Sequence, residues 1–203
     1  MSDPGGLHWR IVTLVAAAAA AGLGAAWLLG REPALALQSG TKLDSPRALL
    51  EFALVDPAGG AFTRENLRGR WTLLFAGFTN CPDICPMTLA QFAGIRRQVP
   101  EDRVQLLFLS VDPERDTPAR IGQYLGHFGP GLAGATGSTE AVDAFAAQLG
   151  LAHVRIPGAD GNYSVDHSAA LVLIDPEARI AAYFTPPHDT AALVADLSRL
   201  PAG

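Results

Sequence analysis

Two cysteines are the residues of this chain whose type and spacing most clearly suggest chemistry. Cys81 and Cys85 are the only cysteines among 203 residues, and one motif holds both: Thr79-Asn80-Cys81-Pro82-Asp83-Ile84-Cys85-Pro86. Four positions make about one helical turn, so the two sulfurs can point the same way if Pro86 opens a helix. A small disulfide and a shared metal ion both fit this spacing. A closed four-thiolate zinc site is excluded, because it needs more sulfurs than the chain has.

The elements next to the cysteines should favour their reactivity. The apolar run from Trp71 to Phe78 predicts a buried strand that ends just before them. Helical spacing of apolar residues predicts a helix from Pro86 to about Gln98, and Val104 to Val111 reads as the next buried strand. Sulfurs near a helix N-terminus feel the positive end of its dipole, which favours thiolate over thiol. Thiolate is the form that attacks disulfides and binds metals.

The rest of the domain continues the alternation of strands and helices. The sequence predicts a hairpin over 52–63, helices over 118–128, 140–149 and 191–200, a polar excursion over 158–164, and strands over 169–174 and 180–184. A cysteine pair between a central strand and the next helix is typical of a thioredoxin-like α/β fold, a central mixed sheet flanked by helices. We expect this domain to span residues 48–203.

The N-terminal segment has its own composition. Residues 11–30 carry no charge and stand between Arg10 and Arg31, a length that spans a bilayer as a helix. The motif Ala34-Leu35-Ala36 also fits a signal-peptidase site, so a cleaved signal is the rival interpretation. We predict an uncleaved membrane anchor over 1–31 and a linker over 32–47 that holds the domain off the membrane.

Composition excludes one class of function and constrains the fold. The net charge of -5 provides no basic stripe for a phosphate backbone, so nucleic-acid binding is not expected. Two cysteines in one motif do not make a disulfide-stapled scaffold. With 49% hydrophobic residues, the fold must instead rest on an apolar core.

The spacing alone leaves redox and metal chemistry open. Redox proteins of this architecture commonly use Cys-x-x-Cys, whereas three residues intervene here. Cu(I) prefers soft thiolates at low coordination number, and an imidazole could complete a trigonal site. The chain offers His8, His127, His153, His167 and His188. His153 and His167 are the serious candidates, and we expect His167 in a loop just before a buried strand, where sites in open sheets gather.

Three motifs in register resemble the Sco/SenC family of membrane-anchored, thioredoxin-like copper proteins. They are the cysteine motif from Gly77 to Pro86, the stretch Ser110-Val111-Asp112-Pro113-Glu114-Arg115-Asp116-Thr117-Pro118, and Val165-Asp166-His167-Ser168. The resemblance implies that Cys81, Cys85 and His167 bind copper, as Cu(I) and also Cu(II), and that the cysteines form a disulfide when metal-free. It further implies that Asp112, Arg115 and Asp116 shape or line the site. Asn80 departs from the family pattern and leaves the ligands intact.

The same resemblance implies a role in assembly of cytochrome c oxidase. The protein would be a metallochaperone that passes copper to the binuclear CuA centre of oxidase subunit II, with its soluble domain in the periplasm and its anchor in the bacterial inner membrane. The alternative is a thiol-disulfide oxidoreductase that reduces the cysteines of that site. Metal binding needs His167 and thiol exchange does not. Other periplasmic copper chaperones or thiol reductases are further partners. A peroxidase of related fold would use Thr79, but the remaining pattern is missing.

Overall fold

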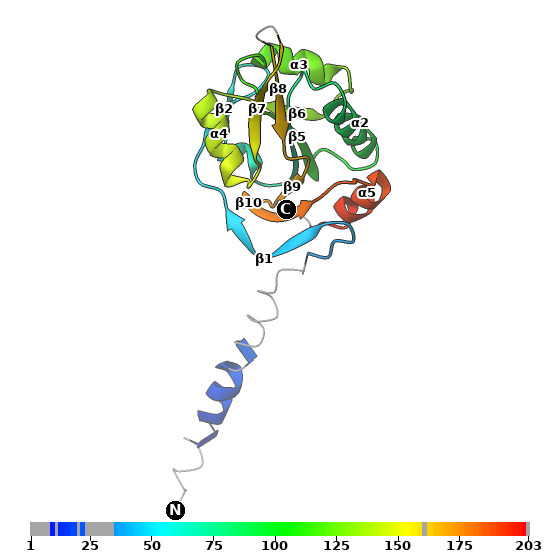
Figure 1. The fold of residues 1–203 in the computed structure, drawn as a ribbon. Helices are drawn as coiled ribbons and strands as arrows, with labels where there is room; N and C mark the ends of the chain where they lie inside the picture. Colours follow the sequence, from blue (N-terminus) through cyan, green and yellow to red (C-terminus); the bar gives the residue numbers. More distant parts are fainter. Residues whose placement is uncertain (1–8, 11, 20, 23–34, 160–161, 202–203) are drawn as a thin grey trace, which may run out of the picture. The chain divides into compact units, whose positions relative to one another are not determined.

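The computed structural model describes residues 9–10, 12–19, 21–22, 35–159 and 162–201, and it divides into two compact units, Met1–Leu35 and Ala36–Gly203 (Figure 1). Residues 9–10, 12–19 and 21–22 of the first unit are helical. Within the described parts of the chain, no helix is both long enough and apolar enough to cross a membrane. The anchor predicted over 1–31, with its uncharged run 11–30, lies partly outside the described residues, so it stays a prediction.

The second unit is built on a six-stranded mixed sheet, which confirms the predicted fold class. Its strand order is β1 (Thr41–Ala48), β10 (Arg179–Phe184), β9 (Leu171–Ile174), β4 (Trp71–Gly77), β5 (Val104–Ser110) and β6 (Leu132–Ala135). Strands β4, β5 and β6 run parallel, whereas β9 is antiparallel to both β4 and β10. Every residue of β4 and β5 is buried, as expected for parallel strands covered on both faces.

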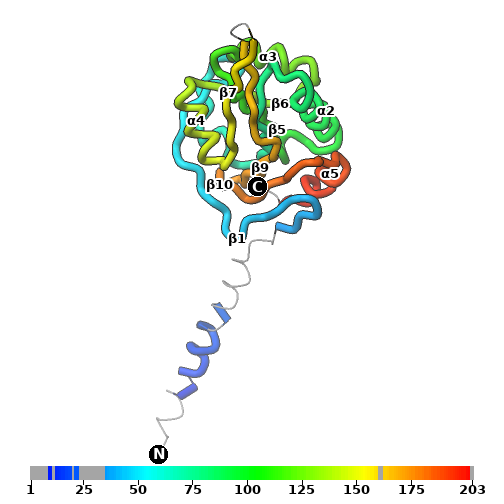
Figure 2. The backbone as a smooth tube through the Cα atoms, in the orientation of Figure 1, coloured from blue at the N-terminus to red at the C-terminus, as the bar shows by residue number. Residues whose placement is uncertain are grey.

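Helices and two hairpins surround this sheet. The helices are α2 (Ile84–Arg96), α3 (Pro118–Gly126), α4 (Thr139–Gln148) and α5 (Thr190–Ser198), with a short 3-10 helix η1 (Arg64–Leu67). The hairpins are β2 (Ala53–Val55) with β3 (Ala61–Thr63), and β7 (His153–Pro157) with β8 (Tyr163–His167). Figure 1 shows α2 and α5 beside each other and apart from α4, and β7 next to β8; Figure 2 traces the same backbone as a tube.

The linker predicted over 32–47 is wrong over its second half. Residues Thr41–Ala48 form the edge strand β1, which pairs with β10 from Thr41↔Tyr183 to Ala48↔Arg179. Most β1 side chains are exposed, so no apolar alternation signals the strand, and backbone pairing decides the structure. Just before it, the buried carboxylate of Asp196 accepts hydrogen bonds from the backbone of Gln38 and Ser39 at 2.8 and 2.9 Å, which fixes the chain to α5.

Three further expectations near the site need correction. Helix α2 begins at Ile84 rather than at Pro86, so Cys85 lies within its first turn. Proline is tolerated there because the first-turn N–H groups lack helical partners. His167 ends strand β8 rather than occupying a loop, because the polar stretch before it folds back on β7. Strands β6 and β7 were not predicted, since β6 is only four residues long and consists mostly of alanine and glycine, and β7 mixes polar with apolar residues.

Candidate metal centre

The two cysteines lie at the connection between β4 and α2. After Gly77 the backbone turns, and the Cys81 N–H donates to the Phe78 carbonyl at 3.2 Å. The Cys85 N–H, in the first turn of α2, points at the Cys81 sulfur with a separation of 3.5 Å. Both thiols are free, Cys85 buried and Cys81 half-buried. The helix N-terminus therefore directs a donor at Cys81, as the sequence analysis expected.

His167 comes to the same point from β8. Its Nε2 atom lies 3.4 Å from the Cys85 sulfur, and its Nδ1 atom lies 3.1 Å from the Ser168 carbonyl oxygen. A carbonyl can only accept, so in the neutral ring we assign the proton to Nδ1, which leaves the Nε2 lone pair facing the sulfurs. The Cys81, Cys85 and His167 ligand atoms all lie within 4.8 Å of one another. This arrangement fits a soft metal ion with low coordination number.

Burial sets the protonation of two of these groups. It raises the pKa of the Cys85 thiol well above its ordinary range, with a smaller opposing effect from a backbone hydrogen bond to Phe78. It also lowers the pKa of His167, partly offset by the hydrogen bond to Ser168. At neutral pH the imidazole is therefore neutral, the form that binds metals, and a metal ion must displace the Cys85 proton.

An apolar wall surrounds the ligands. The ring centres of Phe75 and Phe78 each lie 5.8 Å from that of His167 in edge-on contacts. Gly77 also borders the ligands, since a Cβ atom added there would lie only 2.8 Å from the Cys85 sulfur. The absence of a side chain at Gly77 thus provides the space that this sulfur occupies.

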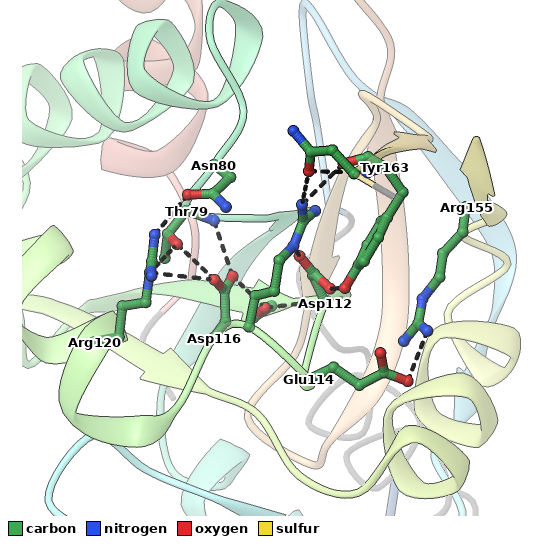
Figure 3. A network of polar contacts seen from close by, with 11 residues as sticks. Thr79, Asn80, Asp112, Glu114, Asp116, Arg120, Arg155 and Tyr163 are labelled. Atoms are coloured by element: carbon green, nitrogen blue, oxygen red, sulfur yellow. Dashed lines mark hydrogen bonds and ion pairs between the residues drawn. The ribbon is translucent and has the colours of Figure 1, made fainter. Parts of the chain in front are cut away.

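Asp116 holds the loop that carries Cys81 (Figure 3). Its buried carboxylate accepts from the Thr79 N–H at 2.8 Å, from the Thr79 hydroxyl at 2.5 Å and from the Ser110 hydroxyl at 2.7 Å. From α3, Arg120 donates to the Thr79 hydroxyl at 2.8 Å and to the Asn80 side-chain oxygen at 2.5 Å. Asn80 is therefore engaged within the domain, and these contacts fix the chain just before Cys81.

Asp112 and Arg115 hold the strand that carries His167. Asp112 is fully buried and accepts from the Tyr163 hydroxyl at 2.6 Å and from Arg115 Nε at 2.5 Å. These residues are not metal ligands in this arrangement. They hold the strand that carries a ligand, in line with the expectation that they shape or line the site. Sequence reasoning missed Tyr163, Arg120 and Gly77. Tyr163 could have been found from its spacing to His167, because residues an even number of positions apart in one strand share a face.

The other histidines that the structure describes lie elsewhere. His153 pairs opposite His167 across the hairpin, but its Nε2 atom lies 2.9 Å from an Asp143 carboxylate oxygen. His127 contacts the Tyr124 carbonyl at the end of α3, and His188 contacts the Ala169 carbonyl at 2.9 Å. His8 lies outside the described residues. Of the two serious candidates, only His167 joins the cysteines.

Comparison with known proteins places this arrangement in a family. A sequence model described as SCO1/SenC matches residues 41–202. The mitochondrial SCO2 homologue of Bos taurus is 36% identical over 195 residues, which cover 90% of this chain and 72% of that protein. The structure of Bradyrhizobium japonicum ScoI with copper bound is 36% identical at a TM-score of 0.70, covering 75% of this chain and 98% of that one. The copper-bound ScoI of Arabidopsis thaliana is 35% identical at a TM-score of 0.68, with coverages of 74% and 98%.

These findings confirm the thioredoxin-like Sco fold, and they confirm copper as a metal of the family, since two of the relatives were solved with it. The matched region includes both cysteines, the stretch from Ser110 to Pro118 and His167. The chain belongs to the SCO1/SenC family.

Proposed function

We propose that this protein binds one Cu(I) ion through Cys81, Cys85 and His167 and carries it as cargo to cytochrome c oxidase during assembly. The observation that carries the proposal is the convergence of two sulfurs and an imidazole nitrogen within 4.8 Å. Two thiolates and one imidazole suit a soft monovalent ion, whereas harder ions such as Mg²⁺ prefer oxygen.

The site is arranged for release as well as for binding. Cys85 is buried, whereas Cys81 and His167 are half-buried and border the surface. Near Cys81, the first turn of α2 exposes Ile84 by 43% and Met87 by 62%. A three-coordinate ion leaves room for an incoming thiolate, so a partner docked over this end of α2 could take the metal by ligand exchange.

The partner in this proposal is oxidase subunit II, whose binuclear CuA centre is built from cysteines and histidines. The setting is the outer face of the bacterial inner membrane, with residues 11–30 as the anchor. Support for the anchor comes from the uncharged length of that segment. Support for the partner comes from the family to which the chain belongs.

A transfer experiment tests this function. The full-length protein in detergent is loaded anaerobically with Cu(I), mixed with the reduced, metal-free CuA domain of subunit II, and separated from it. We expect copper to leave the donor and appear on the acceptor. Copper that stays on the donor under all ratios would contradict delivery.

The second candidate function, reduction of the acceptor's cysteines, is favoured by one observation. The Cys85 N–H faces the Cys81 sulfur at 3.5 Å, an arrangement that stabilises a Cys81 thiolate as the attacking group. The same mixture, started with an oxidised acceptor and no copper, distinguishes the two functions. Loss of the acceptor disulfide with matching oxidation of Cys81 and Cys85 supports this role, and an unchanged disulfide excludes it.

A further inference from the structure

The hairpin that carries His167 is separate from the large sheet. In the part of the chain that the structure describes, β7 and β8 pair only with each other. A connection of three residues, 168–170, joins His167 to β9. The backbone pairing of the six-stranded sheet therefore does not fix the third ligand, and side-chain contacts must hold the hairpin against the domain.

One face of β8 makes these contacts. Tyr163, Val165 and His167 alternate along the strand and share a face. Val165 is buried, whereas the intervening Ser164 and Asp166 are exposed, so the shared face is turned inward. A strand rises about 3.3 Å per residue, which puts Tyr163 about 13 Å along the strand from His167. Contacts at Tyr163 therefore act at the far end of the hairpin and control its angle.

Tyr163 makes several interactions with the segment after β5 (Figure 3). Its hydroxyl donates to the Asp112 carboxylate at 2.6 Å, and its carbonyl accepts from Arg115 at 2.8 Å. The Arg115 guanidinium also stacks 3.7 Å from the centre of the Tyr163 ring. Asp112 has no exposed surface, and its second oxygen is held by Arg115 Nε. The acceptor for the tyrosine is thus a fixed, desolvated carboxylate, which makes a strong hydrogen bond.

The same arginine also reaches the surroundings of His167. The Arg115 guanidinium lies 5.8 Å from the centre of the Phe78 ring. Phe78 in turn meets His167 edge-on, with ring centres 5.8 Å apart and planes at 88°. Displacing the Tyr163 end of the hairpin would therefore disturb the packing on the imidazole as well as the strand that carries it.

We propose that Tyr163 is a positioning residue for the third copper ligand. Its hydroxyl, bound to Asp112, holds the β7–β8 hairpin closed, so that His167 Nε2 stays beside the cysteine sulfurs. The proposal rests on the copper site of the proposed function. Asp116 holds the loop before Cys81 through a separate set of hydrogen bonds. Opening the hairpin should therefore weaken copper binding and leave the redox chemistry of the cysteine pair unchanged.

The test is Tyr163→Phe in the full-length protein, which removes one hydroxyl and keeps the ring. Tyr183→Phe is the chemical control, since Tyr183 lies on β10 and its hydroxyl donates to the Leu149 carbonyl, after α4, at 3.0 Å. Glu114→Gln is the positional control, because its exposed ion pair with Arg155 at 2.6 Å joins the same two segments. We expect Tyr163→Phe to weaken Cu(I) binding about 10- to 100-fold in competition with a chelator. Both controls should change it by about twofold at most.

Two further readouts exclude a general loss of structure. The midpoint potential of the Cys81–Cys85 disulfide should match the parent in all variants. In the metal-free protein, the β8 amides should exchange their hydrogens about tenfold faster in Tyr163→Phe than in either control. Parental copper affinity with parental exchange in Tyr163→Phe would overturn the proposal, as would an equal loss in Tyr183→Phe. If the parent itself bound no copper, the proposed function would fail, while the exchange measurement would still decide whether Tyr163 holds the hairpin.

Discussion

Replacing Gly77 with alanine should damage the copper site at the Cys85 sulfur. The new Cβ would lie 2.8 Å from the Cys85 sulfur and 3.0 Å from ring atoms of both Phe75 and Phe108. Nonbonded carbon contacts are normally about 3.5–4.0 Å, so something must withdraw by roughly 1 Å. Both rings and Cys85 are fully buried, so the core must absorb the crowding, and the Cys85 sulfur is the closest of the three contacts. Overpacking of this kind costs about 1–3 kcal/mol and lowers the thermal midpoint by about 3–10 °C.

The effect on copper should exceed the effect on folding. Metal–ligand distances tolerate deviations of about 0.2 Å, so a displacement of the Cys85 sulfur should weaken Cu(I) affinity at least about tenfold. Gly94→Ala in α2 is the matched control, because its Cβ would meet Thr190 at an ordinary 3.5 Å. Alanine should stabilise that helix by up to about 1 kcal/mol and leave copper binding unchanged. Chelator competition and thermal unfolding measure both quantities. Parental affinity and midpoint in Gly77→Ala would refute the reasoning.

Two other predictions concern charge. Asp116→Asn places a donating amide group against the Thr79 and Ser110 donors, which then lack an acceptor. It should lower the free energy of unfolding by about 2–3 kcal/mol in a denaturant titration. An unchanged midpoint would contradict this. Because burial raises the pKa of Cys85, the free protein keeps this proton at pH 7–9. Cu(I) binding should release it, so affinity rises with pH by about tenfold per unit from this thiol alone. Calorimetry in buffers of different ionisation enthalpy counts the proton, and no release would argue against Cys85 as a ligand.

The local sequence pattern was sufficient to predict the central strands, which are buried on both faces. Strands β4 and β5 could be predicted from their continuous apolar sequences, because parallel central strands are apolar on both faces. The cysteine pair could be placed between β4 and a helix, because it directly follows one of these apolar runs. The edge strand β1 could not be predicted from the sequence. Its exposed residues show no alternation of apolar and polar side chains, and it is a strand because it pairs with β10.

The third ligand shows where local reasoning stops. His153 and His167 face each other in the same hairpin, yet one contacts Asp143 and the other the cysteines. That difference depends on which neighbour covers each strand end, and spacing along the chain does not contain it. The family resemblance selected His167. Tyr163 was missed for the same reason, because its partner Asp112 is a tertiary neighbour 51 positions away in sequence.

Copper stoichiometry of the full-length protein shows whether Cys81, Cys85 and His167 together hold one copper ion. The protein is reduced, loaded anaerobically with Cu(I), freed of excess metal and analysed beside His167→Ala and His153→Ala. We expect one copper per chain in the parent and in His153→Ala, and a clear loss in His167→Ala with its disulfide still able to form. Copper retained in His167→Ala, or lost equally in both histidine variants, would contradict the three-ligand site.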